Sequence, residues 1–186
     1  MDTKIVAKRT RWYRKIHRYI AIASFFFLLL ISVTGLLLIW KKNTGGYLLA
    51  DTHKGTSTDL GKWLSFDSLQ NLAVIALRDS VSPELSPTLN RIDARPGKGM
   101  VKFVFEDHYW AIQLDGATGK VLHLERRRAD FIENLHDGSY FDKYTGGFSK
   151  LGYGSFVGLS LLLLTITGFY LWINPRRMRK KKRDAE

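Results

Sequence analysis

YIAIASFFFLLLISVTGLLLIW, residues 19–40, is a predominantly apolar stretch without a charged side chain. At about 1.5 Å of rise per residue, a helix of this length covers roughly 30 Å, the thickness of the hydrocarbon core of a bilayer. The segment before it, residues 1–18, contains seven Lys or Arg residues and one Asp. Such an excess of Lys and Arg beside a first span keeps that side of a protein in the cytoplasm. We therefore expect a transmembrane helix that begins at the cytoplasmic face.

A cleaved signal peptide is the alternative interpretation, because it also has a basic start followed by an apolar region. The apolar region of a signal peptide is shorter, and a cleavage site of small residues follows it. Here the sequence continues with Lys41, Lys42 and Asn43. We expect the span to remain in the protein as a membrane anchor.

A second stretch without charge, LGYGSFVGLSLLLLTITGFYLWI at residues 151–173, is also long enough to cross a bilayer. It precedes a basic tail, residues 174–186, which again contains seven Lys or Arg residues. Both termini are therefore expected in the cytoplasm, with residues 41–150 on the outer side. Paired basic tails on a small α+β module suit the inner membrane of a bacterium, which would place the central domain in the periplasm.

The net charge of +12 is concentrated in the two tails. Membrane topology and anionic lipid head groups explain basic tails next to apolar spans, so we do not expect nucleic acid as a partner. The chain has no cysteine, which excludes disulfides, thiolate metal sites, iron–sulfur clusters and cysteine nucleophiles. No Ser/His/Asp order, phosphate loop or pair of catalytic carboxylates is recognisable.

The central region begins with a linker, residues 41–65, and continues with a predicted helix, FDSLQNLAVIALRDS at residues 66–80. Ser65 can cap the free amides at its start, and Pro83 ends the run. The apolar stripe of this helix consists of Phe66, Leu69, Ala73, Ala76 and Leu77.

Four predicted strands, residues 89–95, 100–106, 109–114 and 120–126, are separated by turn signals. Loop length sets the expected register, in which Ile92 lies opposite Phe103, Phe103 opposite Ile112, and Ile112 opposite Leu122. In the same register Lys102 faces Asp93, and Trp110 faces Leu124. The fold class that follows is α+β, with one helix on a four-stranded antiparallel meander, flanked by two transmembrane helices. A short amphipathic helix, from residue 128 to Gly138, is expected just outside the membrane.

The hairpin HYWAIQLDGATGKVLHL, residues 108–124, resembles the signature hairpin of PepSY domains. The flanking stretches KIHRYIAIASFFFLLLISVTGLLL, residues 15–38, and ENLHDGSYF followed by LLLLTITGFYLWINPRR, residues 133–141 and 161–177, resemble PepSY-associated transmembrane proteins. Larger members of that family are similar to four-span ferric-siderophore reductases that carry b-type haem on paired histidines, whereas this chain has two spans.

The resemblance implies haem b as a cofactor, with His17 and His136 as its ligands and no other metal. The alternative roles are an interfacial side chain beside lipid phosphate for His17, and a helix-terminal histidine for His136. The first span separates the two side chains by about 30 Å, so they cannot bind one haem within a chain. A homodimer would pair each histidine with its own copy, giving four helices and two haems. Gly154 and Gly158 provide a small-xxx-small face that could allow the helices to approach.

Two functions remain open. The first is electron transfer to ferric iron in reductive iron uptake. The second is a non-enzymatic binding or assembly subunit of a larger membrane complex, whose PepSY domain holds a periplasmic partner protein. The cluster Arg126, Arg127 and Arg128 could bind such a partner or an anion, although a solvated junction near lipid head groups explains it as well. His108 and His123 are expected to lie apart, and the sequence shows no partner for His53.

Overall fold

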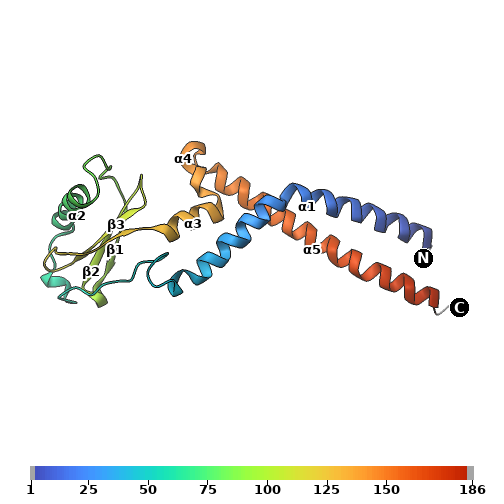
Figure 1. Cartoon of the computed structure of the whole chain (residues 1–186), viewed down its shortest axis with the longest axis horizontal. Coiled ribbons are helices and arrows are strands. Elements are labelled where there is room, and N and C mark those ends of the chain that lie inside the picture. Colours follow the sequence, from blue (N-terminus) through green and yellow to red (C-terminus); the bar gives the residue numbers. More distant parts are fainter. Residues whose placement is uncertain (1–2, 184–186) are drawn as a thin grey trace. The chain divides into compact units, whose positions relative to one another are not determined.

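The structure, a computed structural model, describes residues 3–183. The chain divides into two compact units (Figure 1). One unit comprises Met1–Leu36 with Glu133–Glu186 and contains most of the two long helices, and the other comprises Leu37–Ile132 and contains the sheet. Each unit is described by itself.

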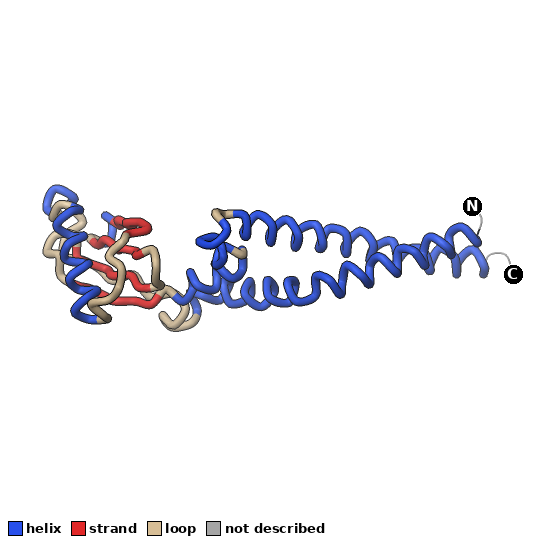
Figure 2. Tube along the Cα trace, turned by 90° about the horizontal axis from the view of Figure 1, so that it is seen from above, coloured by secondary structure: helices blue, strands red, loops and turns tan. Residues whose placement is uncertain are grey.

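The helical unit is built on α1 (Thr3–Trp40) and α5 (Phe148–Arg183), which run antiparallel (Figure 2). Two stretches, Ile5–Asn43 and Phe148–Met178, are long and apolar enough to cross a membrane. Ring contacts join the helices at two levels, with the ring centres 4.1 Å apart for Tyr13 and Tyr170 and 5.3 Å apart for Phe27 and Phe156. Both helices extend beyond the predicted spans.

Proline does not end the second long helix, because Pro175 lies inside α5. It removes one backbone donor but leaves the turns on either side in helical geometry. The helix α3 (Arg128–Asp137) ends at Gly138, whose positive φ of 80° is the usual helix-terminating conformation. This end point confirms the predicted amphipathic helix. The short segments η4 (Ser139–Phe141) and α4 (Asp142–Thr145) then lead into α5.

The second unit is an antiparallel meander in the order β1-β2-β3-β4, with one α-helix, α2 (Phe66–Ser80). The strands are β1 (Leu89–Arg95), β2 (Met100–Phe105), β3 (Trp110–Asp115) and β4 (Val121–Arg126). The side chain of Ser65 accepts a hydrogen bond from the Ser68 amide, which confirms the predicted cap. Single-turn 3-10 helices occupy Lys41–Asn43, Leu60–Lys62 and Pro96–Lys98.

The predicted register is confirmed for the first two hairpins and wrong for the third. Phe103 lies between Ile92 and Ile112, and Lys102 lies opposite Asp93. In the third hairpin Ile112 pairs with Leu124 instead of Leu122, and Trp110 pairs with Arg126 instead of Leu124. An irregularity between Gln113 and Leu114 inserts one extra residue, Leu122, into β4, and the turn before it is one residue longer than expected, so that Leu114 pairs with Val121. The shift of two residues keeps Leu124 on its expected face, because side chains alternate with a period of two.

The core lies between α2 and one face of the sheet. Fully buried side chains from α2 meet fully buried side chains from the strands: Leu69, Ala73, Leu77, Val101, Phe103, Phe105, Ile112 and Leu114. Phe66 is 49% exposed, so the prediction that it belongs to the buried stripe is wrong. It occupies the first position of α2, where its side chain precedes the part of the helix that covers the sheet.

The opposite face of the sheet is covered by part of the predicted linker, residues 51–57, which we call the strap. Gln113 and Asp115 are buried on this face and hold the strap. The side-chain amide of Gln113 donates to the Asp51 carbonyl at 2.9 Å and accepts from the His53 amide at 3.1 Å. Asp115 accepts from the Thr56 amide at 3.0 Å and from its hydroxyl at 3.1 Å. The strap is therefore an integral layer of this unit.

Candidate functional site

The first predicted site residue, His17, lies on α1 and contacts Thr167 on α5. Its ring nitrogen Nδ1 is 2.7 Å from Thr167 Oγ1. Thr167 is 4% exposed, and its Oγ1 also lies 2.6 Å from the carbonyl oxygen of Leu163, one turn earlier in α5. The contact thus ties a histidine near one end of α1 to the backbone of the other long helix.

The Thr167 hydroxyl has one proton and two neighbours, so its role towards His17 depends on the tautomer of the imidazole. When the hydroxyl donates to the Leu163 carbonyl, which can only accept, its lone pairs accept from His17 Nδ1–H. A neutral imidazole with its proton on Nδ1 has an unprotonated Nε2, which is the form that binds a metal ion.

The second predicted site residue, His136, makes the same arrangement with α1. His136 Nδ1 is 2.9 Å from Thr34 Oγ1, and Thr34 Oγ1 lies 2.7 Å from the carbonyl oxygen of Leu30. Thr34 is 5% exposed. When Thr34 donates to the Leu30 carbonyl, His136 likewise donates through Nδ1 and presents Nε2 as an acceptor.

A glycine follows each of these threonines and leaves room for the imidazole ring. A Cβ atom at Gly35 would lie 3.3 Å from His136 Cε1, and one at Gly168 would lie 3.6 Å from His17 Cε1. Each histidine therefore lies on a Thr-Gly pair of a long helix. We call these two arrangements, His17 on Thr167-Gly168 and His136 on Thr34-Gly35, the inner and outer half-sites, after the membrane sides predicted from the sequence.

The structure keeps the two half-sites apart. Thr34 is seventeen positions after His17 on the same helix, which corresponds to about 25 Å along the axis. The two imidazoles therefore cannot bind one iron within one chain, as expected from the sequence. Each half-site supplies one histidine.

The outer half-site has a carboxylate beside it. Asp137 pairs with Lys150 at 2.6 Å and accepts from the Ser139 hydroxyl at 2.6 Å and its amide at 2.9 Å. Partial burial raises the pKa of Asp137, but the hydrogen bonds from Lys150 and Ser139 outweigh it, so that its pKa is lowered from the ordinary value of 3.8. The residue after His136 is thus a fixed negative charge at neutral pH.

Gly154 and Gly158, the predicted dimer face, lie on an exposed side of α5. A Cβ atom at either position would meet nothing within 4 Å. This side of α5 is therefore available to another helix, and its role in dimerisation stays a prediction.

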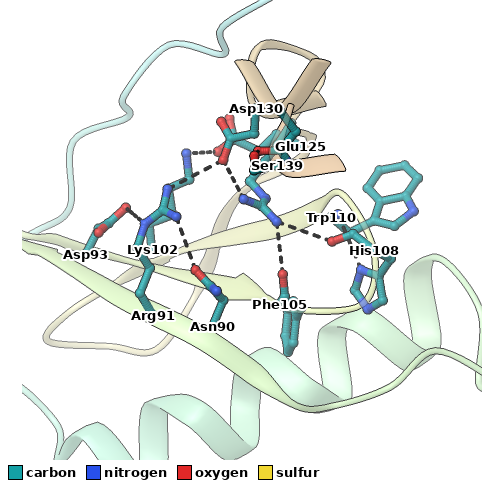
Figure 3. A network of polar contacts seen from close by, with 12 residues as sticks. Asn90, Arg91, Asp93, Lys102, Phe105, His108, Trp110, Glu125, Asp130 and Ser139 are labelled. Carbon is teal, nitrogen blue, oxygen red and sulfur yellow. Dashed lines mark hydrogen bonds and ion pairs between the residues drawn. The ribbon is translucent and has the colours of Figure 1, made fainter. Parts of the chain in front are cut away.

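The arginines predicted as a partner or anion site have different surroundings. Arg127 is committed to internal contacts, donating to the carbonyls of Phe105 and His108 and pairing with Asp130, three partners that Figure 3 labels. Arg128 lies 4.4 Å from the ring centre of Tyr47, and Arg126 is exposed. Anion or partner binding stays a prediction, for which Arg126 and Arg128 are the accessible members.

The same region contains a buried ion pair that the sequence did not reveal. Lys102 on β2 pairs with Glu125 on β4, and Glu125 is 5% exposed. A charge of this kind requires its partner, because an unpaired buried carboxylate is costly. The pair is part of the sheet's second face and serves its structure.

The remaining histidines lie in the second unit. His108 Nε2 is 3.1 Å from the Ser86 carbonyl oxygen. His53, for which the sequence showed no partner, lies beside His123, with ring centres 4.8 Å apart. Within residues 3–183, no group of three or more His, Cys, Asp or Glu side chains is arranged to hold a metal ion.

These features define a class of membrane protein in which two long apolar helices accompany a small α+β unit, with one histidine on each of two Thr-Gly pairs. The chain matches the family model described as the PepSY-associated TM region over residues 14–185, and it belongs to that family. No curated protein matches the chain. No solved structure matches it either.

Proposed function

We propose that two copies of this chain form an electron-transfer unit of the bacterial inner membrane, with haem b at the two half-sites and ferric iron as the external electron acceptor. The observation that supports this proposal is the hydrogen-bond contact of Nδ1 of His17 and of His136 with a buried threonine hydroxyl, which leaves Nε2 of each ring for a ligand when Nδ1 carries the proton. Histidines that bind a metal usually donate their other ring proton to a neighbouring acceptor, which fixes the tautomer and the ring orientation. The donor set therefore fits a haem iron with imidazole ligands.

The two-fold dimer follows from the number of ligands. Bis-histidine ligation requires two imidazoles on one iron, and each half-site offers one. A second copy would supply the other, so that His17 pairs with the partner's His17 and His136 with the partner's His136. The open face at Gly154 and Gly158 gives the second copy a place to pack against α5.

Bound haem would supply a reversible one-electron couple. The chain's own contribution is to hold each imidazole in one tautomer, to surround it with apolar helices that exclude water, and to set two positions at different depths of the bilayer. One electron that arrives from a cytoplasmic donor reduces one Fe³⁺ to Fe²⁺ on the outer side. The basic tails, with seven Lys or Arg residues each, would keep the inner half-site at the cytoplasmic face.

A second candidate function is a non-enzymatic subunit that holds a periplasmic partner protein. The exposed side of α2 favours it, because Leu72 and Ile75, three positions apart on this helix, are 37% and 55% exposed. Neighbouring exposed apolar side chains mark many protein–protein interaction sites. Such a subunit would need no cofactor.

An absorption spectrum of protein extracted from haem-supplied membranes distinguishes the two functions. A Soret band with sharp α and β bands after reduction supports electron transfer. His17→Ala should then leave about half of the haem, and His136→Ala should leave the other half, because each ligand belongs to a separate site. His108→Ala is the control, since this side chain belongs to the second unit. A colourless dimer, or full haem content in the His17→Ala/His136→Ala double variant, contradicts the proposal.

A further inference from the structure

A pair of histidines in the second unit lies outside both half-sites. The rings of His53, on the strap, and His123, on β4, have centres 4.8 Å apart and planes tilted by 33°. His53 is exposed and His123 is half-buried, so solvent reaches the pair. The two residues are seventy positions apart in the chain, and the fold alone brings them together.

One residue, Gln113, contacts the backbone around His53 and lies opposite His123 in the sheet. Gln113 lies directly opposite His123 in the β3–β4 ladder. The Gln113 side chain, 1% exposed, also holds the backbone on each side of Thr52 through the His53 amide and the Asp51 carbonyl. The position of His53 relative to His123 is therefore set by a buried side chain.

The separation of the rings, which is also that of an ordinary ring contact, allows both imidazoles to bind one ion. A metal–nitrogen bond of about 2.0–2.1 Å places the centre of each imidazole about 3.2 Å from the ion. Two such ligands at an angle of about 90–110° then have ring centres about 4.5–5.2 Å apart. The observed 4.8 Å lies within this interval.

We infer that His53 and His123 form a two-histidine site for a divalent transition-metal ion on the extramembrane unit, with water completing the coordination. Imidazole suits Cu²⁺, Zn²⁺ and Ni²⁺, and the general order of affinities makes Cu²⁺ the tightest of these. The site is independent of haem, because none of its residues belongs to a half-site. An ion bound there joins the strap to β4 and adds a cross-link between them.

Copper titration of the full-length protein in detergent micelles tests the inference. The titration uses the His17→Ala/His136→Ala variant, so that the half-sites do not contribute nitrogen ligands. We expect one Cu²⁺ per chain, with an electron paramagnetic resonance spectrum that shows two nitrogen ligands. Zn²⁺ should compete for the same site.

Single variants in that background locate the site. His53→Ala and His123→Ala should each weaken Cu²⁺ binding at least tenfold and leave a one-nitrogen spectrum. His108→Ala, which removes the histidine of the same unit that contacts the Ser86 carbonyl, should change neither value. Far-ultraviolet circular dichroism should show the same fold in all variants, because the pair is accessible to solvent. Unchanged affinity in His123→Ala, or an equal loss in His108→Ala, overturns the inference.

Discussion

Thr167→Val is the most direct perturbation of the inner half-site. Valine has nearly the shape of threonine, so the packing between α1 and α5 stays in place while the acceptor of the His17 proton disappears. The present contact is 2.7 Å long, and Thr167 is 4% exposed, so water does not readily replace the lost oxygen. His17 Nδ1–H would lose its partner, and the imidazole would no longer be held in one tautomer.

The expected effect can be estimated from the geometry. Removal of a residue that orients a metal-ligating histidine typically costs 10- to 100-fold in affinity. That range corresponds to about 1.4–2.7 kcal/mol of binding free energy, and it agrees with about 1–3 kcal/mol for a buried donor left without an acceptor. We therefore expect haem at the inner half-site to bind 10- to 100-fold more weakly in Thr167→Val.

The assay is haem titration of apo-protein in detergent, followed by the Soret band. It is complemented by ¹⁵N NMR of the His17 ring, which reports the tautomer without any cofactor. The apo wild-type protein should show Nδ1–H alone, and Thr167→Val should show a mixture. The NMR result tests the proton assignment even if the protein binds no haem.

Thr165→Val is the matched control. Thr165 Oγ1 donates to the Leu161 carbonyl at 2.8 Å, as Thr167 does to Leu163, but Thr165 is exposed and contacts no histidine. Its loss should leave haem affinity and the His17 tautomer unchanged. If the two valine variants behave alike in both measurements, the threonine does not position the histidine and the reasoning is refuted.

Three further predictions concern the second unit, each measured by urea unfolding of the full chain in detergent, followed by tryptophan fluorescence. Phe103→Ala should lower the unfolding free energy by about 3–5 kcal/mol, because Phe103 is fully buried; a loss below about 1 kcal/mol would contradict its place in the core. Lys102→Met should cost about 3–5 kcal/mol by leaving Glu125 buried without its partner, and the added change Glu125→Leu should recover most of that loss. Burial raises the pKa of Asp115, but hydrogen bonds from Thr56 and nearby amides outweigh burial, so that the pKa in the folded protein is below the ordinary value of 3.8. The stabilising contribution of Asp115 is therefore present above pH 3.8 and is lost as the pH falls through the pKa of the folded protein. Asp115→Asn should therefore be less stable than wild type at pH 7, and the difference should shrink below pH 3.8; a constant difference would refute the assignment.

Local sequence patterns predicted most of the second unit correctly, because its signals act over short distances. Ser65 and the apolar spacing after it define α2, and the turn between Arg95 and Met100 sets the first hairpin. The third hairpin differed because counting loop residues assumes a regular ladder, and the irregularity after Gln113 depends on packing. The strap was predicted only as a linker, because its polar residues have no period and its partners lie on β3.

The half-sites were predictable in part. The histidines stood out because their residue type is uncommon in membrane helices and because the family resemblance marked them. Their threonine partners did not, because Thr167 follows His17 by 150 positions and His136 follows Thr34 by 102. The pair Thr-Gly occurs five times in the sequence, and the available signal was that the pairs at 34–35 and 167–168 lie inside the two apolar spans. The sequence alone did not show which Thr-Gly pair contacts which histidine, because each contact joins two distant segments.

The order of these contacts along the chain has a consequence for biogenesis. In the sequence, Thr34 and His136, which contact each other, both lie between His17 and Thr167, which form the other contact. At about 5–20 residues per second, ribosomal synthesis separates His17 from Thr167 by roughly 8–30 s. During that interval the first span is complete and its histidine has no acceptor. The outer half-site is synthesised in full before the inner one, so a released chain truncated inside α5 before Thr167 contains both residues of the outer contact and only His17 of the inner one.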